Sequence, residues 1–297
     1  MNMKVDLCGV TLNNPVMTAS GTFGSGAEYA EFVDLNKLGA VVTKGVANVP
    51  WPGNPTPRVA EVYGGMLNAV GLQNPGIDLF VERDIPFLKQ FDTKIMVNVC
   101  GHSTEEYIEV VERLRDQPVD LLEINISCPN VKEGGIAFGQ DPKAVEAITK
   151  EMKKHAAQPV IMKLSPNVTD ITEMARAAEA GGADGLSLIN TITGMKIDIN
   201  RQKFVLANKT GGMSGPAIHP VAVRMVYQTA QAVRLPIVGM GGIMNAEDAI
   251  EMILAGATAV SVGTANFTNP HVTEEIVAGI RDYMERYQVA DIRDLVG

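Results

Sequence analysis

Cysteine and histidine are scarce in this sequence of 297 residues, which contains three cysteines and four histidines. Cys8, Cys100 and Cys128 are too few and too widely spaced for a disulfide framework, and an iron–sulfur cluster needs more nearby thiolates than they supply. The histidines are isolated from one another, and neither an HExxH nor a CxxC motif occurs. We therefore predict no metal site in this chain.

Positive charge and long apolar runs are lacking as well. Lys and Arg number 25 against 34 acidic residues, which gives a net charge of −9. This balance argues against binding to nucleic acid or to anionic lipid, although a local pocket can still hold one phosphate. No apolar run reaches the length of a membrane span, and the segment MNMKVDLCGV lacks the pattern of a signal peptide. We expect a soluble, cytoplasmic protein with neither a nucleic-acid nor a membrane partner.

Apolar residues make up 46% of the chain, and many of them fall into short runs rich in β-branched residues. Each run is continuous rather than alternating and stops at polar residues or glycine, which is typical of parallel strands buried on both faces. The runs are residues 15–21, 40–45, 94–101, 121–129, 160–166, 185–191, 237–242 and 259–265.

Helical patterns lie between these runs, at residues 103–116, 141–156, 169–181, 218–233, 245–255 and 270–286. Ser103 and Glu106 form a capping-box pattern. Asp141-Pro142 and Asn269-Pro270 each place a capping residue before a proline at the first helical position. The alternation predicts an α/β fold, a closed (β/α)8 TIM barrel formed as a single domain by residues 1–297. An open doubly wound sheet is less favoured, because its glycine-rich turn follows the first strand, whereas the richest glycine turns here follow the last two.

Three connections are too long for simple turns, namely residues 46–72, 129–140 and 192–215. Each follows the carboxyl end of a predicted strand, where active sites of α/β barrels are built, so we expect functional loops at this face. Residues 5–15 predict a small N-terminal hairpin that caps the opposite end of the barrel.

Polar groups and glycines end the predicted strands and should converge on one cavity at the barrel mouth. Two of them are lysines, Lys44 and Lys163, which are costly to bury unless each meets an anion. Lys163 suits the negative charge of a reduced flavin, and a carboxylate inside the barrel is the alternative partner. The set comprises Ser20, Lys44, Asn98, Asn125, Ser127, Cys128, Lys163, Asn190, Thr191, Gly241, Gly242, Gly263 and Thr264.

The glycine turns at Gly241-Gly242 and Gly263-Thr264 leave backbone N–H groups uncovered, and a predicted helix follows each of them. This is the recurrent position of a phosphate site in α/β barrels, and Gly215 could add a third backbone contact. Tight strand-to-helix turns without a ligand are the alternative interpretation.

Cys128 lies beside the glycine-rich connection 129–140, where a thiolate could act as base or nucleophile, whereas we expect Cys8 and Cys100 to be inert. Several amides also gather near the strand ends. They suit a small planar ligand such as a pyrimidine, unless they bond the loop backbone. These residues are Asn68, Asn98, Asn125 and Asn190.

Over essentially its whole length the chain resembles the class 1 dihydroorotate dehydrogenases, and most closely the catalytic subunit of the type B enzymes. The motifs that carry this resemblance are TASGTFG (18–24), VVTKGV (41–46), NAVGLQNPG (68–76), VNVCG (97–101), EINISCPNVK (123–132), MKLSPNV (162–168), LINTI (188–192), GGMSGPA (211–217), GMGGI (239–243) and VGTANF (262–267).

The resemblance implies an FMN-containing barrel that oxidises dihydroorotate to orotate in pyrimidine biosynthesis. It implies that Cys128 is the base, taking a proton from C5 while a hydride leaves C6 for N5 of FMN. The implied substrate-binding set is Lys44, Asn68, Ala69, Val70, Gly71, Leu72, Asn125, Asn190 and Thr191. The implied FMN-binding set is Ser20, Lys44, Gly45, Asn98, Asn125, Lys163, Ile189, Gly215, Gly241, Gly242, Gly263 and Thr264. Ile189 alone would otherwise be assigned to the core.

Type B enzymes pass electrons to NAD through a second subunit that carries FAD and a [2Fe–2S] cluster, so a heterotetramer with two copies of each chain is expected. Residues 132–141 are more similar to type B, and the chain itself has neither cluster cysteines nor a dinucleotide motif after its first strand. A homodimeric type A enzyme that uses fumarate stays open. Two further alternatives also stay open. One is a flavin-dependent reductase of uracil or of uridine in RNA, and the other is a flavin-free aldolase or isomerase with a Schiff-base lysine.

Overall fold

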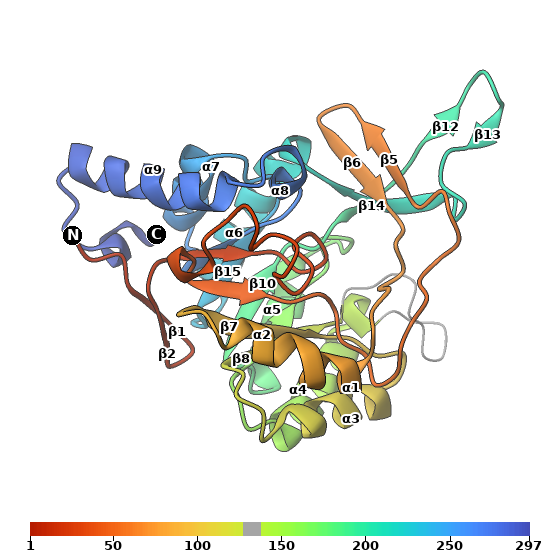
Figure 1. The fold of residues 1–297 in the computed structure, drawn as a ribbon, viewed down its shortest axis with the longest axis horizontal. Helices are drawn as coiled ribbons and strands as arrows, with labels where there is room; N and C mark the ends of the chain where they lie inside the picture. The colour runs from red at the N-terminus through yellow and green to blue at the C-terminus, as the bar shows by residue number, and fades with distance from the viewer. Residues whose placement is uncertain (127–137) are drawn as a thin grey trace.

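A closed barrel forms the centre of the computed structural model, which describes residues 1–126 and 138–297 (Figure 1). Eight of the described strands close the barrel in chain order, and neighbouring strands run parallel. They are β3 (Val16–Thr18), β4 (Ala40–Val42), β7 (Lys94–Val99), β8 (Leu121–Asn125), β9 (Val160–Lys163), β10 (Gly185–Leu188), β15 (Ile237–Met240) and β16 (Ala259–Val262). The predicted TIM barrel is confirmed, and each strand lies within the apolar run that predicted it.

Burial on both faces explains why these runs are continuously apolar. Every residue of β4, β8, β9, β10, β15 and β16 is buried, because one face of each strand fills the barrel and the other meets the surrounding helices. A few polar side chains are buried with them, including Asn98, Glu123, Lys163 and Ser187. These exceptions lead to the site described below.

The helices around the barrel follow the predicted segments. They are α3 (Thr104–Leu114), α4 (Pro142–His155), α5 (Ile171–Ala180), α6 (His219–Ala232), α7 (Ala246–Leu254) and α9 (Val272–Arg286). The predicted caps at Ser103 and Asp141 are confirmed, since each side chain accepts a hydrogen bond from a backbone N–H in the first helical turn. The prediction at Asn269-Pro270 is wrong. There α9 begins two residues later, and the side chain of Asn269 accepts instead from the backbone of His271 in the turn before it.

Two connections between the first barrel strands differ from the regular pattern. Between β3 and β4 the chain forms turns and the short 3₁₀ helix η1 (Leu35–Lys37) instead of an α-helix. Before β7, residues 77–88 form a helical segment that the sequence analysis did not predict, made of α1 (Ile77–Leu79), the π-helical η2 (Phe80–Asp84) and α2 (Ile85–Leu88). Shorter elements complete the fold: η3 (Phe138–Gln140), η4 (Pro216–Ile218), α8 (Ala265–Thr268) and η5 (Ile292–Leu295).

A second, antiparallel sheet covers the carboxyl end of the barrel strands and is built from two of the long connections. Its order is β11 (Ile192–Met195), β14 (Thr210–Ser214), β6 (Gly65–Asn68) and β5 (Val59–Val62). A small hairpin, β12 (Ile197–Asp198) and β13 (Lys203–Phe204), projects beyond it (Figure 1). We expected loops in connections 46–72 and 192–215, but parts of both form strands of this sheet. The strands β6 and β14 pair although they are more than a hundred residues apart, so the local sequence contains no signal of the pairing.

The N-terminal hairpin is confirmed as β1 (Val5–Leu7) and β2 (Val10–Leu12). Its turn lies at the amino end of the barrel strands, where Sγ of Cys8 is 2.7 Å from the position of a Cβ on Gly185, the first residue of β10. Burial raises the pKa of the Cys8 thiol to about 12, helped by the charges of Asp184 and Asp6, which fits the expected inert cysteine. In the described part of the chain, no helix has both the length and the hydropathy of a membrane span.

Candidate active site

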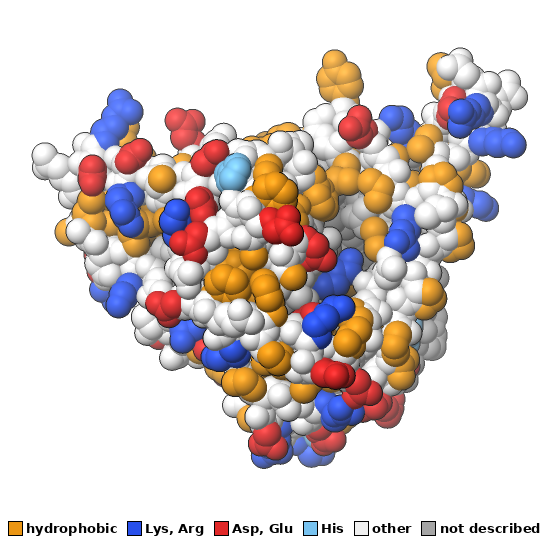
Figure 2. Space-filling model, in the orientation of Figure 1, with side chains coloured by type: hydrophobic (Ala, Val, Ile, Leu, Met, Phe, Trp, Pro, Cys, Tyr) orange, Lys and Arg blue, Asp and Glu red, His pale blue; other side chains and the backbone are white. Residues whose placement is uncertain are grey.

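A cavity of about 600 Å³ lies between the mouth of the barrel and the second sheet. The molecular surface is visibly hollowed beside the arm that carries β12 and β13 (Figure 2). Strand ends of the barrel form its floor, and β6 and β14 of the second sheet form one wall. Its size is that of a pocket that encloses an organic ligand of several rings.

The residues predicted from the strand ends and from the family resemblance meet in this one cavity. Its lining includes the whole predicted cofactor set, namely Ser20, Lys44, Gly45, Asn98, Asn125, Lys163, Ile189, Gly215, Gly241, Gly242, Gly263 and Thr264. It also includes the rest of the predicted substrate set, namely Asn68, Ala69, Val70, Gly71, Leu72, Asn190 and Thr191. Cys128, the predicted base, and Ser127 lie outside the described residues. The location of the other residues is thus established, while their roles stay predictions.

Lys163 reaches the floor of the cavity from the end of β9 and lies between two oxygen atoms. Its Nζ is 3.0 Å from Oγ of Ser20 and 3.4 Å from Oε2 of Glu123. The side chain of Glu123 is almost fully buried, and the two residues form an internal ion pair. The sequence suggested two partners for Lys163, a reduced flavin or a carboxylate inside the barrel. The carboxylate is present, and it is Glu123. It does not exclude a ligand, because Lys163 itself lines the cavity.

Lys44 follows β4 and also lines the cavity, with its backbone N–H bound to the carbonyl of Gly24 at 2.8 Å. Burial lowers the pKa of the Lys44 ammonium, and the positive charge of Arg58 lowers it further. An anionic group in the cavity would counter both effects. Lys44 therefore places a cation at the cavity, next to the amide-rich wall.

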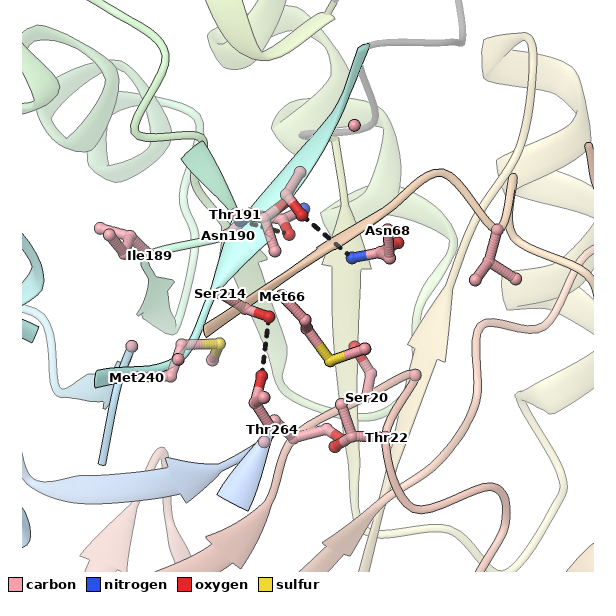
Figure 3. A pocket seen from close by; sticks show the side chains of 18 of the residues that line it. Ser20, Thr22, Met66, Asn68, Ile189, Asn190, Thr191, Ser214, Met240 and Thr264 are labelled. Carbon is pink, nitrogen blue, oxygen red and sulfur yellow. Dashed lines mark hydrogen bonds between the residues drawn. The ribbon is translucent and has the colours of Figure 1, made fainter. Parts of the chain in front are cut away.

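Segment 68–72 forms that wall and is held by the connection that precedes it. Asn54 bonds the carbonyl of Ala69 through its side chain and the carbonyl of Val70 through its backbone, both at 2.9 Å. Opposite, Asn190 accepts a 2.8 Å bond from the backbone of Thr191 (Figure 3). Bonds between asparagine side chains and the backbone were one of the two interpretations given for these amides. Asn68 and Asn190 make such bonds, and both still line the cavity.

Glycine turns form the end of the cavity where a phosphate is expected. Gly215, Gly241 and Gly242 have φ values of +108°, +132° and +70°, which an L side chain rarely adopts. A Cβ on Gly242 would lie 2.7 Å from the carbonyl oxygen of Gly215, so the two turns approach closely only because side chains are absent. Beside them, Thr264 donates a 2.7 Å hydrogen bond to Ser214 of β14, which ties the second sheet to the end of the barrel (Figure 3).

The lining fits a flavin mononucleotide. Within the described ranges, Oγ of Ser261 is a buried hydroxyl without a hydrogen-bond partner, and Ser261 lines the cavity. Close-packed glycine turns offer backbone N–H groups for a phosphate, and Lys163 offers a cation for a flavin that becomes more negative on reduction. Ile189, Met240 and Met66 supply apolar surface for an aromatic ring system (Figure 3).

One cluster has the composition of a metal site. His219, Asp248 and Glu251 place one ligand atom each within 4.8 Å of the others. Hydrogen bonds account for the histidine, because Nδ1 donates to the carbonyl of Gly241 at 2.8 Å and Nε2 lies 3.2 Å from the exposed Glu251. The cluster therefore supports the glycine turn through His219, and it carries no metal proposal.

Sequence reasoning missed two groups of residues. Glu123 lies in the middle of the apolar run 121–129, and a charged residue at that position was itself a signal of a buried polar network. The other group comes from the second sheet, where Met66, Thr193, Thr210 and Ser214 line the cavity. The pair Gly64-Gly65 between two short apolar runs could have indicated a hairpin, but nothing local indicated its partner strands.

The barrel and its pocket define an α/β-barrel protein with a strand-end site for a phosphorylated, planar ligand. The chain belongs to the dihydroorotate dehydrogenase family, since the model of that family matches residues 2–284.

Relatives support this assignment over the full length. The catalytic subunit of dihydroorotate dehydrogenase B (NAD(+)) from Lachnoclostridium phytofermentans is 72% identical over 297 residues, covering 100% of this chain and 99% of that protein. The protein of the same name from Alkaliphilus metalliredigens is 65% identical, covering 100% of this chain and 98% of that protein. The crystal structure of DHODH from Eimeria tenella in complex with ferulenol has a TM-score of 0.82 at 22% identity, covering 100% of this chain and 88% of that one, and it supports the fold.

Proposed function

We propose that this protein is the FMN-binding catalytic subunit of a type B dihydroorotate dehydrogenase, which oxidises dihydroorotate to orotate in pyrimidine biosynthesis. The observation that carries the proposal is the convergence of every described predicted site residue on one cavity. Residues 1–297 act as a single catalytic domain. The alternative of a flavin-free aldolase is less favoured, because the chain belongs to the dihydroorotate dehydrogenase family.

The FMN phosphate would be held by the backbone of Gly215, Gly241, Gly242 and Gly263 and by the hydroxyl of Thr264. Ser20, Gly45, Asn98, Asn125, Lys163 and Ile189 would hold the ring system. Bound FMN supplies the acceptor for the hydride that leaves C6 of dihydroorotate. Lys163 keeps a positive charge in the cavity floor, where it stabilises the negative charge that the ligand gains on reduction.

On the substrate side, Lys44 binds the carboxylate, and the amides of Asn68, Asn125 and Asn190 pair with the N–H and C=O groups of the ring. Segment 69–72 and Thr191 shape the cavity around the ring. Cys128 takes the proton from C5 as general base, as the family resemblance implies. These roles are all part of the proposal.

Anaerobic addition of dihydroorotate to the purified protein tests the proposal. We expect a yellow protein with one FMN per chain whose visible absorption is bleached by dihydroorotate. Cys128→Ala should retain FMN and lower the bleaching rate by about 10²-fold or more, the scale of a lost general base. Cys8→Ala is the matched control, because Cys8 lies at the opposite end of the barrel, and its rate should equal that of the wild type. A colourless protein, or bleaching by dihydrouracil derivatives alone, would contradict the proposal.

Electron transfer to NAD requires a partner in this proposal. The relatives named above are called catalytic subunits, which supports a separate electron-transfer subunit. We propose that this subunit carries FAD and a [2Fe–2S] cluster, that two copies of each chain associate, and that the complex works in the cytoplasm. Affinity purification from the native host should recover an iron–sulfur flavoprotein together with NAD-dependent turnover. Recovery of a homodimer that reduces fumarate would instead assign type A.

A further inference from the structure

Glu123 brings a carboxylate into the interior of the barrel, where its relative exposure is 0%. Its Oε1 accepts a 2.7 Å hydrogen bond from Ser187, and its Oε2 accepts a 2.6 Å bond from the side-chain amide of Asn98. Lys163 lies 3.4 Å from the same Oε2. Four neighbouring strands, β7 to β10, thus contribute one group each. Burying a charge costs free energy unless partners compensate it, and here the three neighbouring side chains provide that compensation.

The network has two layers. Asn98 and Lys163 line the cavity, whereas Glu123 and Ser187 lie beneath them inside the barrel. Glu123 fixes the amide of Asn98, because Nδ2 points to the carboxylate and Oδ1 is left facing Nδ2 of Asn125 at 3.5 Å. It also holds the ammonium of Lys163 against Ser20. The carboxylate therefore determines how two residues of the cavity floor are presented.

We propose that Glu123 is a positioning residue that holds Lys163 and Asn98 in the cavity floor and, by balancing the charge of Lys163, sets the relative affinity of the site for reduced and oxidised FMN. This inference rests on the proposed function, because FMN is its ligand. Reduced flavin carries more negative charge than oxidised flavin, so an unbalanced lysine favours the reduced form more strongly than a balanced one.

Replacing the carboxylate by an amide of the same size provides the test. In Glu123→Gln, we expect the ratio of the dissociation constants of oxidised to reduced FMN to rise about tenfold. That change equals a rise of about 30 mV in the midpoint potential of a two-electron couple. Spectroelectrochemistry of the FMN-loaded variant measures the potential, and fluorescence titration of the FMN-free variant measures the affinity for oxidised FMN.

A double-mutant cycle shows whether Glu123 acts through Lys163. The variant Lys163→Met has no ammonium whose charge Glu123 could balance. Adding Glu123→Gln to it should therefore change the ratio of the dissociation constants of oxidised to reduced FMN by less than about threefold. Glu179→Gln is the matched control, since Glu179 lies on α5 outside the cavity and accepts a 2.9 Å bond from the backbone of Arg234. Its potential should equal that of the wild type.

An unchanged potential in Glu123→Gln, or an equally large effect without Lys163, would overturn the inference. If Glu123→Gln does not fold, Glu123→Asp replaces it in the test, because its shorter side chain withdraws the carboxylate from Lys163 by one methylene. An unchanged midpoint potential in Glu123→Asp would also overturn the inference. The two proposals fail differently. Wild-type protein that binds no FMN contradicts both, whereas wild-type protein bleached by dihydroorotate with an unchanged potential in the variant contradicts only the role of Glu123.

Discussion

Lys44 illustrates how burial and a neighbouring charge act on a single cation of the cavity. Its ammonium is disfavoured by burial and by the charge of Arg58, and both lower its pKa below the usual 10.5. The unfolded chain holds this proton up to a higher pH than the folded protein does. The group therefore costs stability at low pH, and this cost disappears as pH rises through the lowered pKa toward 10.5. A bound carboxylate removes the same cost by pairing with the charge.

The pH dependence of substrate binding should follow from this charge. In the proposed function only protonated Lys44 pairs with the carboxylate. KM for dihydroorotate should therefore rise with pH as pH passes the pKa of Lys44, which burial and Arg58 lower below 10.5. In Arg58→Gln the repulsion is gone and the pKa of Lys44 increases, so the rise should move to higher pH. Arg58→Lys retains the charge and should keep the profile of the wild type. Steady-state kinetics from pH 7 to 10 measure these profiles, and identical profiles in all three proteins would contradict the role of Lys44.

At the scale of elements, the turns after β15 and before η4 work as a pair because glycine lets them approach. Gly242→Ala would place a Cβ 2.7 Å from the carbonyl oxygen of Gly215 and 2.8 Å from Cβ of His219. We expect FMN affinity to fall by about tenfold or more, because backbone at the phosphate end must shift to relieve this contact. Titration of the FMN-free variant with FMN measures the change.

Gly182→Ala is the matched control for that variant. Gly182 has a φ of +87°, similar to the +70° of Gly242, but a Cβ there would meet only Cγ of Lys153 at 3.9 Å. In both variants the left-handed backbone conformation should lower the free energy of unfolding by about 1–2 kcal/mol, so a difference between them does not come from this strain. Unchanged FMN affinity is expected for Gly182→Ala. Equal affinities in the two variants would show that the close approach of the turns does not matter.

The same scale shows which elements the sequence could predict. The barrel strands were predictable because parallel strands buried on both faces form continuous apolar runs, and the helices between them have regular apolar spacing. The second sheet was not predictable, because β6 and β14 pair although they are more than a hundred residues apart in the sequence, and their glycines carry no periodicity. For the site, strand-end polar residues predicted the cavity floor, whereas Glu123 lies one layer deeper and Ser214 belongs to the unpredicted sheet.

For the whole molecule, the cavity joins two parts that have little else in common. The barrel contributes strand ends, and the second sheet contributes a wall assembled from connections that precede β7 and β15. A direct link between these parts is the bond from Thr264, which follows β16, to Ser214 of β14. A ligand that fills the cavity contacts both parts at once, so its binding energy adds to the stability of their arrangement.

Removal of FMN should therefore loosen the second sheet while leaving the far end of the barrel unchanged. With FMN at about 100 times its dissociation constant, the gain of about 2.7 kcal/mol is lost on removal, and the melting temperature should fall by about 5 °C or more. Amide hydrogen exchange should accelerate in β6 and β14, which line the cavity. It should not change in the hairpin of β1 and β2, which lies at the amino end of the strands. Equal acceleration in the hairpin would mean that FMN stabilises the barrel as a whole, rather than its attachment to the second sheet.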